Sequence, residues 1–224
     1  MKHLAIIMDW NRRWARERYL PAIFWHKAGY DNIQVITREA KNLGIQYLTI
    51  WALSTENLKK RESDEIEGII KLIHHAIKLL PDFQKDGVKL QVIGDISKLP
   101  SATQEILVDL QFQTKDNTSI ILTTALVYGW QDEIVRATKK IMQSWVDPES
   151  LNEIEFRKYL DTSILPPPDL IIRTWWDIRH SWFLLYDSAY SEYYFTDMKW
   201  PEFDIDELHK AYSHFNTSQR NFWV

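Results

Sequence analysis

The 224-residue sequence has no cysteine, only 6 glycines and no long apolar run. The lack of cysteine excludes disulfides, thiolate catalysis and cysteine-based zinc sites, and it is typical of proteins in a reducing cytosol. No segment reaches the roughly 20 apolar residues of a membrane-spanning helix. The apolar stretch at 4–8 is too short for the core of a secretory signal, and charged residues follow it at once. We therefore expect a cytoplasmic protein, with membrane contact at most peripheral.

The sequence also lacks an excess of positive charge. It has 27 Lys and Arg against 31 Asp and Glu, a net charge of −4, so no global basic field points to nucleic acid. The glycine motifs G-x-G-x-x-G, Walker A and G-x-S-x-G are absent, so hydride transfer and acyl chemistry are not indicated. Any anion site must be local.

Hydrophobic periodicity predicts an α/β fold. Short β-branched runs alternate with longer amphipathic segments, the pattern of βαβ units. We expect one domain spanning residues 1–224, with a mainly parallel sheet of about six strands flanked by helices. The expected strands are 4–8, 47–53, 89–93, 120–126, 170–172 and, less clearly, 193–195. The expected helices are 26–43, 63–80, 102–114, 131–144, 150–160 and 204–216.

Polar residues gather where the predicted strands end. Residues 9–14 follow the first strand, 54–57 the second and 173–181 the fifth, and Glu192 stands just before the sixth. In open α/β sheets, ligands bind beyond the carboxyl ends of the strands. This edge would combine several arginines with carboxylates, hydroxyls and amides.

Such an edge suits a magnesium-bound phosphate group. Arg12 and Arg13 could bind phosphate oxygens as forks, helped by the backbone N–H groups of a helix start. Asp9 would repel a bare diphosphate, but Mg²⁺ can bridge a carboxylate and phosphates. Glu192 is a candidate second ligand for the metal.

Each of these residues also has a purely structural interpretation. The two arginines could be solvated surface charges, Asp9 could cap a helix, and 54–57 could cap the next one. His26 could be a structural histidine, and Glu192 an edge-strand charge. Their joint placement at strand ends favours a site.

Seven ordered segments resemble the signature blocks of the cis-prenyltransferases, the family of undecaprenyl diphosphate synthase. The likeness runs from about residue 3 to 223. The matching segments are 3–15, 24–29, 54–57, 171–174, 179–185, 189–195 and 200–203.

The resemblance implies an enzyme that condenses isopentenyl diphosphate with an allylic diphosphate, such as farnesyl diphosphate, with help from Mg²⁺. The double bond of isopentenyl diphosphate attacks the allylic carbon, diphosphate leaves, and proton loss gives a new cis alkene. In the family the growing chain fills an apolar tunnel and the protein is a homodimer. The product would be a lipid carrier for cell-wall sugars.

The resemblance also implies roles for single residues. Asp9 matches the essential aspartate that holds Mg²⁺, Glu192 the second metal ligand, and Asn57 a residue proposed to assist proton removal. The early substrate-binding positions are Trp10, Asn11, Arg12, Arg13, Trp14 and His26. The later ones are Ser54, Thr55, Glu56, Leu58, Lys60, Arg61, Arg173, Arg179, His180 and Ser181. Among these, Lys60 stands where the family has an arginine and Leu58 where it usually has an aromatic residue.

One departure is systematic: the sequence has 11 tryptophans and only 6 glycines. Tryptophan stands where the family usually has glycine or another small or polar residue, at positions 10, 25, 130, 175, 176, 182 and 223. Our hypothesis is a lineage that reads UGA as glycine, with the codon translated here as tryptophan. Restoring glycine would give 6 + 7 = 13 glycines and 11 − 7 = 4 tryptophans, close to normal usage. The sequence does not decide Trp145.

Taken literally, Trp10 and Trp176 favour a second function, a noncatalytic prenyl-diphosphate-binding homologue or partner subunit. A blocked site would leave the fold intact and remove activity. The sequence fixes neither the product length nor the allylic primer. The apolar stretch 66–80 is either a tunnel wall or the core face of a helix.

Overall fold

Six strands form one sheet in which every neighbouring pair is parallel, in the order β3-β4-β2-β1-β5-β6. The computed structural model describes residues 1–9, 18–19, 22–60 and 63–218, with the backbone alone at 22–27 and 63–65. The strands are β1 (His3–Ile7), β2 (Tyr47–Ser54), β3 (Val88–Ile93), β4 (Ile120–Tyr128), β5 (Leu170–Thr174) and β6 (Glu192–Thr196). The prediction of a mainly parallel sheet with about six strands is confirmed.

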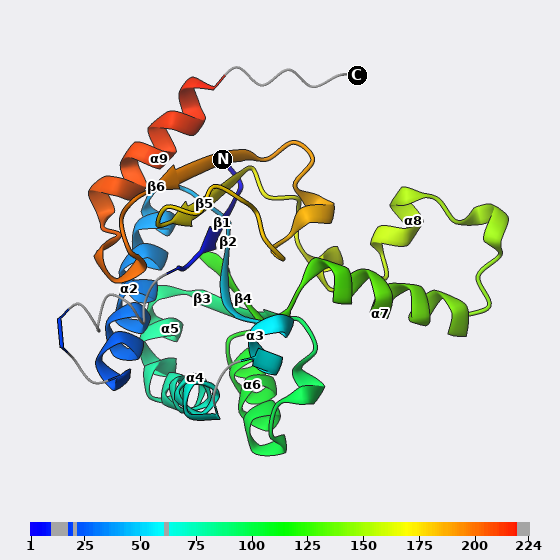
Figure 1. Ribbon diagram of the computed structural model, residues 1–224, viewed down its shortest axis with the longest axis horizontal. Coiled ribbons are helices and arrows are strands. Elements are labelled where there is room, and N and C mark those ends of the chain that lie inside the picture. Colours follow the sequence, from blue (N-terminus) through cyan, green and yellow to red (C-terminus); the bar gives the residue numbers. More distant parts are fainter. Residues whose placement is uncertain (10–17, 20–21, 61–62, 219–224) are drawn as a thin grey trace.

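Helices connect the strands and cover the sheet (Figure 1). They are α2 (Ala22–Asn42), α3 (Thr55–Lys60), α4 (Ser63–Ala76), α5 (Leu80–Asp86), α6 (Ser101–Gln113), α7 (Trp130–Gln143), α8 (Glu153–Arg157) and α9 (Ile205–Thr217). None of the helices within the described residues is long and apolar enough to cross a membrane.

Two predicted helices were wrong in extent. The segment 63–80 is divided, because α4 ends at Ala76 and α5 begins at Leu80 with a proline in its first turn; proline lacks the N–H that a continuing helix would need. The segment 150–160 is helical only over α8. Asn152 fixes the start of α8, since its side chain accepts the N–H groups of Ile154 and Glu155.

Side chains alternate between the two faces of the central strands. Leu4 and Ile6 of β1 lie in the larger apolar cluster with residues of α2, α5 and α9, whereas Ala5 and Ile7 lie in a second cluster with Phe183. All four side chains are at most 1% exposed. Burial on both faces explains why β1 reads as a continuous apolar run.

Helices α7 and α8 form an arm that extends away from the sheet, on the right of Figure 1. The arm carries exposed apolar side chains, with Val135 52%, Met142 80% and Ile154 74% exposed. A group of apolar side chains in solvent commonly marks an interaction surface.

Candidate functional site

An ion pair between Asp9 and Arg173 joins the ends of two neighbouring strands. β1 pairs with β5 in a register that sets Ile7 beside Arg173, so Asp9 lies just beyond the carboxyl end of the sheet. Asp9 Oδ2 accepts hydrogen bonds from Arg173 Nε at 2.8 Å and lies 2.7 Å from Arg173 Nη2. The predicted convergence of these two residues at one edge is therefore present in the fold.

Arg173 is the centre of this group, with a side chain only 5% exposed. Its Nη1 donates to the Ser181 hydroxyl at 2.8 Å and to the backbone carbonyl of Arg179. Its Nη2 also lies 3.3 Å from Asp177 Oδ2. A buried guanidinium with this many fixed acceptors keeps one orientation, which suits recognition of a planar or bidentate anion.

Asp177 links the buried arginine to the exposed Arg179. Arg179 Nη2 lies 2.6 Å from Asp177 Oδ2, and its side chain is 62% exposed. The sequence placed residues 173–181 at this edge but gave Asp177 no role of its own. The sequence signal for such a role was its position four residues after Arg173 and two residues before Arg179.

Burial raises the pKa of the Asp9 carboxyl, and the Arg173 guanidinium opposes this shift. The Asp9 N–H donates to the Thr174 hydroxyl at 2.9 Å, which fixes the backbone of the loop start. Within the described part of the chain, the contacts of the carboxylate are all made through Oδ2. Oδ1 is an available hard oxygen donor of the type that Mg²⁺ prefers.

The second polar segment, 54–57, opens α3 at the same edge of the sheet, just after β2. The Ser54 side chain accepts the N–H of Asn57 at 2.9 Å, so it caps the helix as the structural interpretation expected. Thr55 packs closely on Gly129 at the end of β4, where a Cβ atom would lie 2.7 Å from the Thr55 hydroxyl oxygen. The Trp182 side chain lies against the same glycine, and its backbone carbonyl accepts a hydrogen bond from the N–H of Trp130 at 3.0 Å.

The other predicted positions near α3 and the β5 loop have local partners. Glu56 pairs with Lys60 at 2.6 Å along the exposed side of α3. Leu58 packs against the apolar cluster that includes Ile69 of α4. His180 Nδ1 lies 2.9 Å from the backbone carbonyl of Ser181.

Glu192 does not meet Asp9 within one chain. It is the first residue of β6 and stands in register with Leu170, which itself is in register with Leu4. Asp9 is five residues further along, about 16 Å in the strand direction at ~3.3 Å per residue. Glu192 therefore lies at the amino edge of the sheet, and the shared metal site expected for these two acids is not formed within one chain. No group of three or more acids and histidines is placed to hold a metal in the described residues.

Several predicted site residues lie outside the described residues. These are Trp10, Asn11, Arg12, Arg13, Trp14 and Arg61, and the side chain of His26.

Trp175 has the backbone of a glycine position. Its φ is +70°, in the left-handed region that large residues rarely occupy. Its ring lies 4.9 Å from the Lys199 ammonium and 5.8 Å from the ring of Trp176. Trp176 is 71% exposed.

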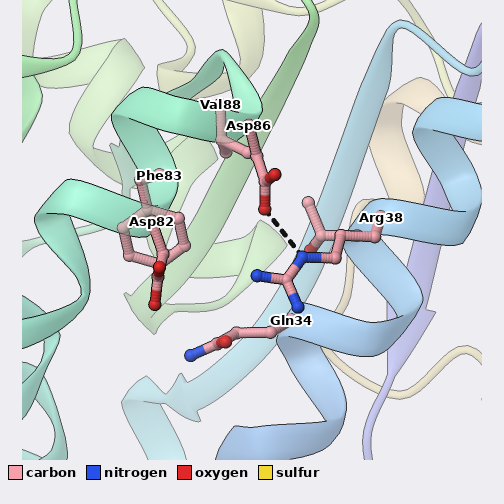
Figure 2. A pocket seen from close by; sticks show the side chains of 7 residues that line it. Gln34, Arg38, Asp82, Phe83, Asp86 and Val88 are labelled. Carbon is pink, nitrogen blue, oxygen red and sulfur yellow. Dashed lines mark hydrogen bonds and ion pairs between the residues drawn. The ribbon is translucent and has the colours of Figure 1, made fainter.

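The predicted tunnel is not seen among the described residues. Ile69 of α4 is buried in the cluster with Leu107 and Leu126, with Ile66 and Ile73 packed against it, as the core-face interpretation of 66–80 expects. A small hollow elsewhere lies between α2 and α5, where Arg38 pairs with Asp86 at 2.7 Å (Figure 2). Figure 2 shows this ion pair beside the hollow, which Asp82 and Gln34 also line.

Comparisons with known proteins cover nearly the whole chain. A family described as "Putative undecaprenyl diphosphate synthase" matches residues 7–223. An isoprenyl transferase of Clostridium tetani is 43% identical over 99% of this chain and 88% of its own length. One from Streptococcus agalactiae is 43% identical over 98% of this chain and 91% of its own length.

Two solved structures share the fold. A lavandulyl diphosphate synthase from Lavandula x intermedia, in complex with dimethylallyl diphosphate, superposes with a TM-score of 0.90 at 31% identity, covering 98% of this chain and 97% of its own. A probable undecaprenyl diphosphate synthase from Campylobacter jejuni gives 0.83 at 31% identity, covering 99% and 98%. The fold and the named relatives favour an enzyme over a noncatalytic homologue.

Proposed function

We propose that this chain, which belongs to the undecaprenyl diphosphate synthase family, is an isoprenyl transferase that joins isopentenyl diphosphate to an allylic diphosphate and forms a cis-polyprenyl diphosphate. Farnesyl diphosphate is the proposed primer, and a lipid carrier for cell-wall sugars is the proposed product class. The observation that carries the proposal is the Asp9–Arg173 pair at the carboxyl edge of the sheet, 2.7 Å apart. It combines a cation for phosphate oxygens with an acid for Mg²⁺.

The residues of this edge have separate proposed roles. Arg173, Arg179 and Ser181 bind the diphosphate of isopentenyl diphosphate, with Arg173 already fixed by its contact to the Ser181 hydroxyl. Asn57, held by the cap at Ser54, assists removal of the proton. The remaining matched positions contact substrate: Trp10, Asn11, Arg12, Arg13, Trp14, His26, Ser54, Thr55, Glu56, Leu58, Lys60, Arg61 and His180.

Asp9 is the proposed ligand of Mg²⁺ in this chain, because Oδ1 is an available oxygen and Mg²⁺ commonly binds through one carboxylate plus substrate phosphates. When bound, the ion would stabilise negative charge on the departing diphosphate. The guanidiniums of Arg173 and Arg179 hold the diphosphate of isopentenyl diphosphate, which stays on the product, and so orient its double bond toward the allylic carbon. As the allylic C–O bond breaks, the isopentenyl double bond forms the new C–C bond and a proton is lost.

The proposed assembly is a homodimer. Support comes from the α7–α8 arm, whose exposed Val135, Met142 and Ile154 need an apolar partner surface. A second copy is also the one way for Glu192 to approach an Asp9, because one chain holds them at opposite edges. The proposed location is the cytoplasm, with peripheral membrane contact where the apolar product is delivered.

We further propose that the seven tryptophans at glycine-type positions are glycines in the native protein. Trp175 supports this, because its φ of +70° is costly for any side chain with a Cβ atom. The positions are 10, 25, 130, 175, 176, 182 and 223. A glycine at 10 would let the backbone approach phosphate oxygens.

A condensation assay tests the function. Two forms are incubated with farnesyl diphosphate, labelled isopentenyl diphosphate and Mg²⁺: the sequence as printed and one with glycine at the seven positions. We expect longer labelled products from the glycine form and little or none from the printed form. If neither form makes product, the proposed function is wrong.

A further inference from the structure

Both arginines of the proposed isopentenyl diphosphate site share one carboxylate oxygen. Asp177 Oδ2 lies 2.6 Å from Arg179 Nη2 and 3.3 Å from Arg173 Nη2. Two guanidiniums thus converge on a single anionic oxygen. This is the environment that a phosphate oxygen of the substrate would occupy.

We propose that Asp177 is an internal counter-anion for Arg173 and Arg179, and that the diphosphate of the substrate displaces it. This inference rests on the proposed function, because it takes the two arginines as the diphosphate site. It gives Asp177 a positioning role, since the carboxylate acts through the arginines and not on the reacting atoms.

The burial of the three side chains decides which of them moves. Arg173 is 5% exposed and is held independently by Asp9 and Ser181. Arg179 is 62% and Asp177 34% exposed, so water can solvate both when they separate. Exposed ion pairs are weak, and a diphosphate carrying several charges can replace this one.

The charges of the group also favour exchange. Asp9 and Asp177 balance Arg173 and Arg179, so the ligand-free group is neutral overall. Displacement of Asp177 leaves two cations facing the diphosphate, with Asp9 available to the metal. The return of Asp177 to the arginines would then assist release of the product diphosphate.

The sign of one substitution effect separates this role from a merely structural one. Asp177→Asn keeps the shape and removes the competing charge, so anions should bind more tightly. If Asp177 served only to support the loop, the same change would disorder the arginines and weaken binding.

Isothermal titration calorimetry with inorganic pyrophosphate, at fixed Mg²⁺, measures this in the full chain. We expect Asp177→Asn to bind about fivefold more tightly than the unchanged protein, the scale of one exposed ion pair. Asp177→Glu keeps the charge, so its affinity for pyrophosphate should stay within about twofold of that of the unchanged protein. Asp86→Asn, which breaks the separate ion pair with Arg38, is the matched control and should leave binding unchanged.

Unchanged or weaker binding in Asp177→Asn, or no pyrophosphate binding in any form, would overturn the inference. Transferase activity of the form with glycine at the seven positions is measured alongside. Tighter binding in the variant together with inactivity of that glycine form would support the counter-anion role and contradict the proposed function, so the two can fail separately.

Discussion

At the scale of single residues, Trp145 shares with Trp175 the left-handed backbone conformation that glycine adopts most easily. Trp145 has a φ of +55°, follows the end of α7 and is 98% exposed. The position just past a helix end is where glycine most often adopts the left-handed conformation. The sequence did not decide Trp145, and its backbone favours adding it to the glycine-type positions.

Trp145→Gly should therefore stabilise the protein. The left-handed conformation costs a residue with a Cβ atom about 1–2 kcal/mol, and the extra freedom of glycine in the unfolded chain offsets part of this gain. We expect the free energy of unfolding in urea to rise by about 0.5–1 kcal/mol. Trp145→Ala, which keeps the Cβ atom, is the control and should change little. A loss of stability in the glycine variant would contradict this assignment.

At the scale of elements, Ser54 shows that a cap and a substrate contact need not exclude each other. Its oxygen accepts the N–H of Asn57 and so starts α3. The hydroxyl hydrogen can still be donated to a phosphate oxygen. Both interpretations of 54–57 can therefore hold together.

Ser54→Ala should lower the free energy of unfolding by about 1 kcal/mol, the usual value of an N-cap. It should also raise KM for the diphosphate substrates. Asn152→Ala removes the cap of α8, far along the chain from the site residues, and should cost similar stability with KM unchanged. Equal KM values in the two variants would leave Ser54 with a capping role alone.

The strands could be predicted from the sequence more closely than the helices. Buried parallel strands are continuous apolar runs, so all six were found, and the first was predicted at 4–8 and observed at His3–Ile7. The strand order was not predicted, because it depends on pairing between distant segments. Helix ends were missed where local chemistry intervenes, as with the proline that opens α5.

For the site as well, the placement that follows from the strands could be predicted, whereas the contacts that depend on side-chain conformation could not. Asp9 and Arg173 could be predicted to lie at one edge because both come at the carboxyl ends of predicted parallel strands, but only the structure shows that β1 and β5 are neighbours. The bridging by Asp177 depends on side-chain conformations that the sequence does not specify. Glu192 is the first residue of its strand, and in a parallel sheet this places it at the opposite edge.

At the scale of the whole molecule, His3 joins three segments of the fold. Its Nδ1 lies 2.6 Å from the Pro166 carbonyl and its Nε2 2.8 Å from the Thr49 hydroxyl. A carbonyl only accepts, so Nδ1 carries the proton and Nε2 accepts from the hydroxyl. Burial lowers the pKa of His3 to about 4.

This lowered pKa predicts a loss of stability in acid. The unfolded histidine takes up a proton near pH 6.5, whereas the folded one resists until about pH 4, so unfolding becomes easier as the pH falls between these values. When the pH falls from 7 to 4.5, the free energy of unfolding should decrease by about 2–3 kcal/mol more in the unchanged protein than in the His3→Gln variant. Urea unfolding at both values measures this difference. Equal losses in the two proteins would show that His3 does not remain neutral.

The α7–α8 arm predicts the assembly state. Met142→Glu with Ile154→Glu places charge on its exposed apolar side chains, and should shift the mass seen by sedimentation equilibrium from about twice 26.8 kDa toward 26.8 kDa. Phe112→Glu, at an exposed position of α6, should leave the dimer intact. An unchanged dimer in the arm variant would place the interface elsewhere.

The most direct test of the account is the incorporation of labelled isopentenyl diphosphate by the glycine form of the chain, with and without Asp9→Asn. The substitution keeps the size of the side chain but removes the charge that would hold Mg²⁺ beside Arg173. The account predicts long labelled product from the unsubstituted form and a loss of about 100-fold or more in the variant, with the fold retained. Equal incorporation by the two forms would contradict it.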